Sequence, residues 1–433
     1  MTFQDVYSYE YNHERFYGAY ILDLRKEYEI SQKELAKILH ISNSTLSKME
    51  SGQQNMNIET FNSAIQYFET YDQNYHFNKE ISKLKEAEDW VDRCVREFVD
   101  LSYENALCEF KGYLNSENNK HSFAYFHYRL VHSFYNLFLG KGSMKEVQHI
   151  IDSQYFINEY YLALLYDLLG IIEDIADPDI TRRQIRALQK ASSLAQHTRR
   201  RDLSGLIEYH LIYRYGDIGQ FLDALNLVAQ CIENLQQAGA YRRILTVRMN
   251  EGILYRNLNL YSKAIEIYQN IVNNYSQIKD PIIQKEIFDN LAWCKFMQQK
   301  DEEAIIYALK GLDMGSLFPD LYIVLVFSNY RLKNHEQADH FAREFIRKKT
   351  NGKRSSFIKL FMKLLLSILN NEQDIADLST QILSMLPQYH AVELEIPLYC
   401  LLIEHYQKQN DFQAVIQYQT LLIQYLLHDF CIH

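Results

Sequence analysis

The sequence predicts an all-α protein, and the first reason is its low content of glycine and proline. Among 433 residues there are only 14 glycines and 5 prolines, which are the residues that the many turns of sandwiches and barrels require. Apolar residues recur at helical spacing, as at Ile58, Phe61, Ala64, Ile65 and Phe68. The hydrophobic fraction of 47% is sufficient for a large core. We therefore expect an all-α fold built from many helices in series.

The head, residues 1–70, is expected to hold short capped helices. Ser31 is followed three residues later by Glu34, a capping-box spacing that begins a helix. Ser42 is placed to cap the next helix, which ends near Gly52. Only about three residues separate these two helices, the geometry of a helix-turn-helix. His40 stands at the turn position where glycine is usual, so it is expected to adopt a left-handed conformation.

The segment from Leu24 to Gly52 resembles the XRE/Cro-type helix-turn-helix in nearly every position of that pattern, from Leu24-Arg-Lys through Ser31-Gln and Leu35-Ala to Ser42-x-Ser-Thr-Leu-Ser-Lys-Met-Glu-x-Gly52. The resemblance implies that the helix beginning near Asn43 enters the major groove of DNA and that Gln32 touches a phosphate. The DNA contacts that it implies are Gln32, Asn43, Ser44, Thr45, Ser47 and Lys48. Asn and Ser/Thr side chains suit base edges, and Lys suits phosphates.

Charge bears on how DNA would be bound. The formal net charge is −10, and residues 20–56 hold five basic and five acidic side chains. Phosphate neutralisation supplies much of the affinity for DNA, so a neutral head predicts dimerisation on a pseudo-palindromic site. A head that only binds protein remains the alternative. The aromatic N-terminal arm (Phe3, Tyr7, Tyr9, Tyr11) either packs on its own chain or swaps onto a partner.

Residues 71–89 predict a linker helix, and residues 90–433 predict helix pairs in series. Asn250 precedes Ala264 by fourteen residues, and Asn290 precedes Ala304 by the same interval. The alanine recurs as Ala224, Ala264, Ala304, Ala338 and Ala414. This series resembles the tetratricopeptide repeat, in which small residues let paired helices approach closely. We therefore expect an N-terminal helix-turn-helix domain followed by a tetratricopeptide-like α-solenoid over residues 90–433, for which the resemblance implies peptide binding and dimerisation.

A solenoid groove suits an extended peptide, and Asn offers both a donor and an acceptor to a peptide backbone. Asn250 and Asn290 share one position of the repeat, and His210 takes that position in the preceding copy. The candidate peptide contacts are therefore His210, Arg214, Arg248, Asn250, Tyr255 and Asn290. The other interpretation is that the asparagines bond neighbouring helices.

Residues 181–201 hold seven Arg or Lys and no Asp or Glu. This basic stretch would hold a peptide carboxylate, lie near DNA phosphates, pack on the head, or remain a solvated face.

We expect no enzyme activity, cofactor or metal site. His335 and His340 are five residues apart, one too many for the HExxH zinc signature. Neither a P-loop nor a GxGxxG motif occurs in the sequence. The polar N-terminus and the short apolar runs predict a cytoplasmic protein with no membrane segment.

The order of the two parts resembles the RRNPP-type peptide-sensing regulators, which include the Rgg and PlcR groups. The resemblance implies a dimeric, quorum-sensing-type transcription factor switched by a short signalling peptide. A protein-interaction adaptor and a ligand-independent repressor are the alternatives.

Overall fold

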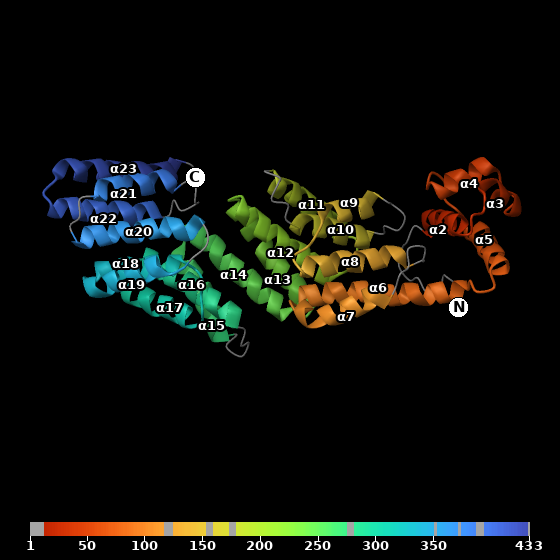
Figure 1. The fold of residues 1–433 in the computed structure, drawn as a ribbon, viewed down its shortest axis with the longest axis horizontal. Helices are drawn as coiled ribbons and strands as arrows, with labels where there is room; N and C mark the ends of the chain where they lie inside the picture. Colours follow the sequence, from red (N-terminus) through yellow and green to blue (C-terminus); the bar gives the residue numbers. More distant parts are fainter. Residues whose placement is uncertain are drawn as a thin grey trace. The chain divides into compact units, whose positions relative to one another are not determined.

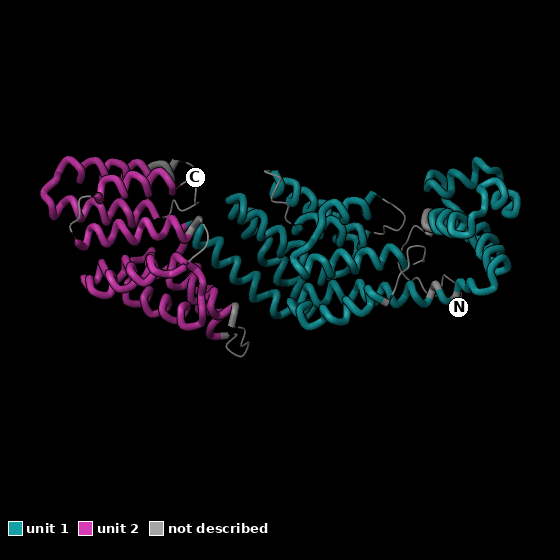
Figure 2. The backbone as a smooth tube through the Cα atoms, in the orientation of Figure 1, with its two compact units in different colours: residues 1–258 teal, residues 259–433 magenta. Residues whose placement is uncertain are grey.

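The computed structural model describes residues 13–116, 124–152, 159–172, 179–274, 281–349, 353–370, 374–386 and 394–431. Within these ranges every regular element is a helix, and no strand occurs, so the all-α prediction is confirmed. The N-terminal arm lies outside the described residues. The chain divides into two compact units, residues 1–258 and 259–433 (Figure 2).

The head opens the first unit and surrounds a small core of its own. Its centre is formed by Ile21, Leu35, Leu46, Phe61 and Phe68, all fully buried. Its helices are α2 (His13–Glu27), α3 (Gln32–Ile38), α4 (Asn43–Glu50) and α5 (Ile58–Tyr71) (Figure 1).

A long helix, α6 (Phe77–Val99), follows the head. It contains residues 77–89 of the expected linker helix and continues ten residues beyond it. Leu84 belongs to the head core, whereas Ala87, Val91 and Val99 belong to the core of the repeats. One helix thus supplies apolar side chains to two cores.

The rest of the first unit consists of antiparallel helices that pack on their neighbours in the chain. They are α7 (Tyr103–Ser116), α8 (Tyr125–Phe138), α9 (Met144–Asp152), α10 (Glu159–Ile171), α11 (Ile180–Ala195), α12 (Arg201–Asp217), α13 (Phe221–Gln237) and α14 (Tyr241–Asn257). First helices of successive pairs also contact one another, α10 with α12 and α12 with α14.

The second unit continues the same plan around its own core. Its helices are α15 (Tyr261–Asn274), α16 (Pro281–Met297), α17 (Asp301–Asp313), α18 (Asp320–Arg331), α19 (His335–Arg347), α20 (Lys353–Asn370), α21 (Ile375–Met385), α22 (Glu395–Lys408) and α23 (Phe412–Cys431). The repeat alanines lie on second helices of pairs; Ala224, Ala264, Ala304 and Ala338 are fully buried, whereas Ala414 is half-buried.

The turns explain how a chain with so little glycine forms so many helix pairs. Most turns between paired helices begin with one residue of positive φ at the end of the first helix and a 6→1 backbone bond, as from Lys300 N to Lys295 O at 2.9 Å. Glycine fills this position at Gly140, Gly219, Gly239 and Gly315. Non-glycine residues fill it elsewhere, with φ between 56° and 62°: Leu101, Asn259, Gln299, Lys333 and Asn410.

Candidate functional site

The expected helix-turn-helix forms as the sequence predicts. The Ser31 hydroxyl accepts from Glu34 N (3.2 Å) and the Ser42 hydroxyl from Thr45 N (3.0 Å), so both N-caps are confirmed. His40 has φ of 54° and Gly52 has φ of 70°, the left-handed conformations expected of the turn and the C-cap.

The helix α4 divides into two faces. Leu46 and Met49 are buried in the head core. The opposite face carries the side chains that the resemblance assigns to DNA. Of these, Asn43, Ser44, Ser47 and Lys48 are exposed, and Thr45 is half-buried with its hydroxyl 2.7 Å from that of Ser42.

Gln32 is held differently from the other candidate contacts. Its Nε2 donates to Glu50 Oε2 at 2.8 Å. Glu50 is 3% exposed and accepts two bonds from Arg25, at 2.7 and 2.9 Å. Arg25 also donates to Ile30 O at 2.9 Å. The bidentate Arg25–Glu50 pair joins α2 to α4, and the bond from Gln32 to Glu50 adds α3 and orients Gln32 at the start of that helix.

Gly18 is a residue of this site that sequence reasoning missed. A Cβ atom built on Gly18 would lie 1.9 Å from the carbonyl oxygen of Met49. Only glycine therefore lets α2 approach the C-terminal end of α4 this closely. No sequence pattern identified it, because the contact joins residues 31 positions apart.

In the repeat body, the structure places two of the six candidate peptide contacts inside the protein. His210 Nδ1 donates to Asp167 Oδ1 at 2.7 Å, and both residues are buried. Arg214 donates to Gly170 O and Ile171 O, each at 3.2 Å. These bonds join α12 to the C-terminal end of α10. At His210, therefore, the side chain at this repeat position bonds a neighbouring helix.

The other candidates are more accessible. On α14, Asn250 and Tyr255 are half-buried, and Arg248 is 42% exposed while pairing with Glu251 at 2.7 Å. In the second unit, Asn290 is half-buried and its Nδ2 donates to Glu286 O of its own helix at 2.9 Å.

The basic stretch separates into structural and exposed arginines. Arg200 bonds Asp92 and Asp202, both at 2.9 Å, and lies over the ring of Tyr160. Burial alone would lower the pKa of Arg200. The hydrogen bond to Asp202 and the negative charges of nearby acidic groups outweigh it, so the pKa is raised. Arg182 and Arg186 are exposed one turn apart on α11.

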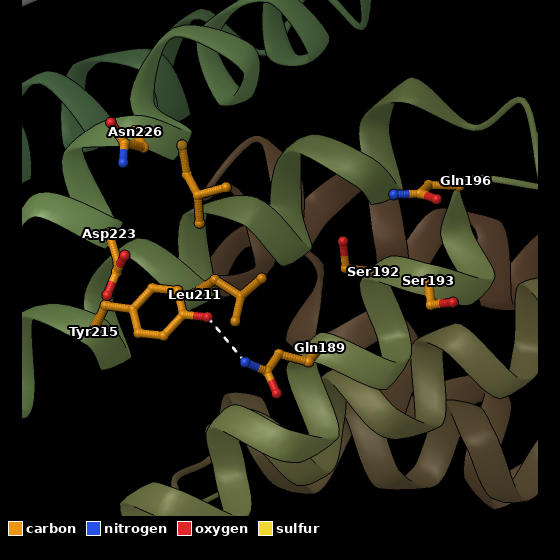
Figure 3. Close-up of a pocket in the computed structure, with 9 residues that line it drawn as sticks. Gln189, Ser192, Ser193, Gln196, Leu211, Tyr215, Asp223 and Asn226 are labelled. Carbon is orange, nitrogen blue, oxygen red and sulfur yellow. Dashed lines mark hydrogen bonds between the residues drawn. The ribbon is translucent and has the colours of Figure 1, made fainter. Parts of the chain in front are cut away.

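A pocket of about 500 Å³ lies beside the same helix, between α11, α12 and α13 (Figure 3). Gln189 Nε2 donates to the Tyr215 hydroxyl at 3.0 Å within it. Six of its nine lining residues carry an amide or a hydroxyl group. The nine are Gln189, Ser192, Ser193, Gln196, Leu211, Tyr215, Asp223, Asn226 and Leu227. Such groups match the donors and acceptors of a peptide backbone. Sequence reasoning missed this pocket, although four of its residues lie in the basic stretch.

Comparison with known proteins identifies the head. The helix-turn-helix family model matches residues 21–70. Regulatory protein RapD of Bacillus subtilis is 24% identical over 191 residues, which are 41% of this chain and 52% of RapD. The chain thus spans about half the length of this curated relative.

Solved structures identify the fold of the body. The apo quorum sensor NprR of B. thuringiensis matches 79% of this chain and 99% of its own, at 15% identity and a TM-score of 0.61. Apo RapI matches 79% of this chain and 96% of its own, at 15% identity and a TM-score of 0.60. NprR with its cognate peptide NprX gives a TM-score of 0.50 at 15% identity, covering 79% of this chain and 98% of its own.

The chain joins an XRE-type helix-turn-helix to a tetratricopeptide-like body with the NprR and Rap fold. The predicted fold, a helix-turn-helix head followed by a tetratricopeptide-like body, is thereby confirmed. Among the described residues, none of the helices has the length and apolar character that a membrane crossing requires.

Proposed function

We propose that this protein is a transcriptional regulator that binds promoter DNA through α4 and is switched by a short signalling peptide. The outward face of α4 carries the proposal. The fold uses Leu46 and Met49 for its core, whereas Asn43, Ser47 and Lys48 are exposed on the helix of a helix-turn-helix. In this proposal the head is residues 1–70, the linker 71–89 and the repeat body 90–433.

Each DNA contact has a chemical role. Asn43, Ser44 and Thr45 stand at the N-terminal end of α4, where they reach base edges. Ser47 and Lys48 hold phosphates, and Gln32 does so from its position beside Glu50. Since the head has balanced charge, a homodimer on a pseudo-palindromic site supplies the affinity, with half-sites about one or two helical turns apart, ~34 Å per turn.

The peptide would lie against the first helices of the repeat body. Arg248, Asn250 and Tyr255 of α14 are accessible enough to contact a peptide bound to the first unit. Asn290 of α16 is the candidate peptide contact of the second unit. His210 and Arg214 hold α10 against α12. Support comes from the fold, which is that of a quorum sensor crystallised with its cognate peptide. We propose a cytoplasmic regulator without enzyme activity.

The test of DNA binding uses the full chain and a pool of random DNA duplexes. A duplex retained through repeated selection is titrated at several salt concentrations. Lys48→Ala is expected to weaken its binding at least about tenfold and to reduce the salt dependence by about one phosphate contact per head. Lys79→Ala, an exposed lysine of α6, is the matched control and should change neither. Failure to retain any duplex contradicts the proposal.

The test of peptide binding uses a pool of short synthetic peptides. Asn250→Ala and Asn290→Ala are expected to weaken the retained peptide about tenfold while duplex affinity without peptide stays unchanged. Equal loss of duplex and peptide binding would indicate misfolding and count against two separate sites.

A second candidate is a protein-interaction adaptor whose head only docks or dimerises. The similarity to RapD, together with the Rap fold of the body, favours it. A pull-down from lysate that returns one protein in stoichiometric amount, with no DNA retained, would support this alternative over the regulator.

A further inference from the structure

The C-terminal end of α6 is held by two arginines of α14. Beyond Val99 the helix ends through Leu101, whose φ is 56°. Backbone bonds cap part of this end, from Ser102 N to Glu97 O at 2.9 Å and from Leu101 N to Phe98 O at 3.4 Å. Arg243 donates through Nε to Val99 O at 3.2 Å and through Nη2 to Phe98 O. Arg242 donates to Leu101 O at 3.2 Å. Two cations thus meet the negative end of the helix dipole.

Arg243 is held on every side. It is 3% exposed, and its guanidinium lies 5.4 Å from the ring centre of Phe98 and 4.7 Å from that of Tyr209. Burial lowers the pKa of Arg243. The ring of Phe98 is in turn 5.5 Å from that of His210, which bonds Asp167. A buried guanidinium persists only where its donors and charge are satisfied, so the geometry of this contact is tightly specified.

Two other arginines also donate to the last carbonyls of a helix, and each joins helices that are neighbours in the stack. We call such a contact an arginine clamp. Arg214 of α12 holds the end of α10 through Gly170 O and Ile171 O. Arg331 of α18 holds the end of α16 through Phe296 O at 3.1 Å. These pairs are 43 to 44 and 35 residues apart, whereas Arg243 reaches back 144 residues to Val99. The α14 clamp therefore bypasses the intervening helix pairs.

The other end of α6 lies in the head. Leu84 is buried in the head core, and the ring of Phe77 lies 5.5 Å from that of Phe61. From Leu84 to Val99 the helix runs for about 22 Å at 1.5 Å per residue, and α6 contains neither Gly nor Pro. A helix without these residues lacks the usual sources of a kink, so it transmits displacement along its length.

The candidate peptide contact Asn250 lies on the same face of α14 as Arg243. Seven residues separate them, which is two helical turns or about 10.5 Å. A ligand that displaces or tilts α14 at Asn250 therefore acts on the helix face that holds α6.

We propose that Arg243 is the positioning residue that couples the peptide-binding helix α14 to the DNA-binding head through α6. A peptide that prefers one position of α14 would select one position of the end of α6, and α6 would carry that change to the head. Peptide binding as the cause of the change rests on the proposed function, whereas the contact between α14 and α6 does not.

The first test measures amide hydrogen exchange in the full chain. Arg243→Gln, which keeps donors and removes the charge, is expected to speed exchange in the last turn of α6 at least about tenfold while exchange in α16 stays as in the unmodified protein. Arg243→Lys should lie between the two, because it offers one charged donor group in place of a fork. It also replaces Arg243→Gln if that variant fails to fold.

Two controls separate coupling from stability. Arg242→Gln removes one exposed bond at the same helix end and should change exchange by no more than about twofold. Arg331→Gln removes a clamp in the second unit, so it should lower the melting temperature but leave exchange in α6 unchanged. Unchanged exchange in α6 of Arg243→Gln would overturn the proposal.

The second test compares duplex affinity with and without the peptide retained from the synthetic pool. In Arg243→Gln the ratio of the two affinities should fall to about one with the peptide Kd within about threefold, whereas Arg242→Gln and Arg331→Gln keep the ratio. A ratio that survives in Arg243→Gln overturns the coupling. Suppose that the unmodified protein binds the duplex equally well with and without peptide, while Arg243→Gln still speeds exchange in the last turn of α6. The link between α14 and α6 then stands, and the proposed function fails.

Discussion

The head and the first helices of the repeat body use their candidate contact residues in opposite ways. On α4, the expected DNA contacts Asn43, Ser47 and Lys48 are exposed, and the core is made by other positions. On α12, the expected peptide contacts His210 and Arg214 are buried in hydrogen bonds to α10. An isolated surface helix separates its reading face from its packing face. The first helix of each pair packs on several sides. The same position of the repeat is therefore buried in one copy, as at His210, and more accessible in the next, as at Asn250.

The largest expected effect tests this difference directly. His210→Ala should lower the free energy of unfolding by about 3 kcal/mol, because it leaves the buried Asp167 carboxylate without its histidine partner. Lys48→Ala on the exposed face should change it by less than about 0.5 kcal/mol. Denaturant unfolding of the two variants checks both values. Equal small effects would show that the buried network contributes little to stability.

The second effect concerns packing within the head. Gly18→Ala should cost on the order of 3 kcal/mol and unfold the head locally, because the new methyl group overlaps the Met49 carbonyl. Gly112→Ala is the matched control: its Cβ meets nothing within 4 Å in the interior of α7, so the variant should gain about 0.5–1 kcal/mol. Calorimetry of both variants gives the comparison, and a stable Gly18→Ala head would refute the close approach.

The smallest of the three effects is a pH dependence located in the repeat body. Burial lowers the pKa of His127 from 6.5 to about 3. Neither of its ring nitrogens has a hydrogen-bond partner among the described residues. The unfolded chain therefore takes up the proton first, so this contribution to stability is complete above pH 6.5 and is lost as the pH falls toward 3. Between pH 7 and pH 5 the loss should be about 2 kcal/mol.

His127→Leu should flatten that pH dependence, since the replacement has no proton to bind. His340→Leu, which replaces an exposed histidine of α19, should leave it unchanged. Denaturant titrations at the two pH values measure the slope. A slope that persists in His127→Leu would assign the pH dependence to other groups.

Local chemistry explains what could be read from the sequence. Ser31, Ser42 and Gly52 act within one turn of the helices they terminate, so their spacing sufficed to place them. His40 was expected in a left-handed conformation and has it. The low glycine content correctly predicted a helical protein. The chain needs few glycines because several of its turns place other residues, such as Gln299 and Lys333, at positive φ.

Contacts between distant residues could not be read in the same way. The approach of Gly18 to Met49, the bonds of Glu50 to Arg25 and Gln32, and the reach of Arg243 to Val99 all depend on how helices pack. The pocket beside α11 likewise combines residues of three helices. None of these has a characteristic spacing in the chain.

The sequence alone determined that this protein is helical, that its head is a helix-turn-helix and that helix pairs follow it, because caps, turns and apolar periods act over a few residues. The tertiary structure decided which polar side chains are left for ligands. Asn250 and His210 occupy the same position of the repeat, yet only His210 is fully committed to its neighbour Asp167. The physical reason is that burial belongs to the packed surroundings of a residue rather than to its position in a motif.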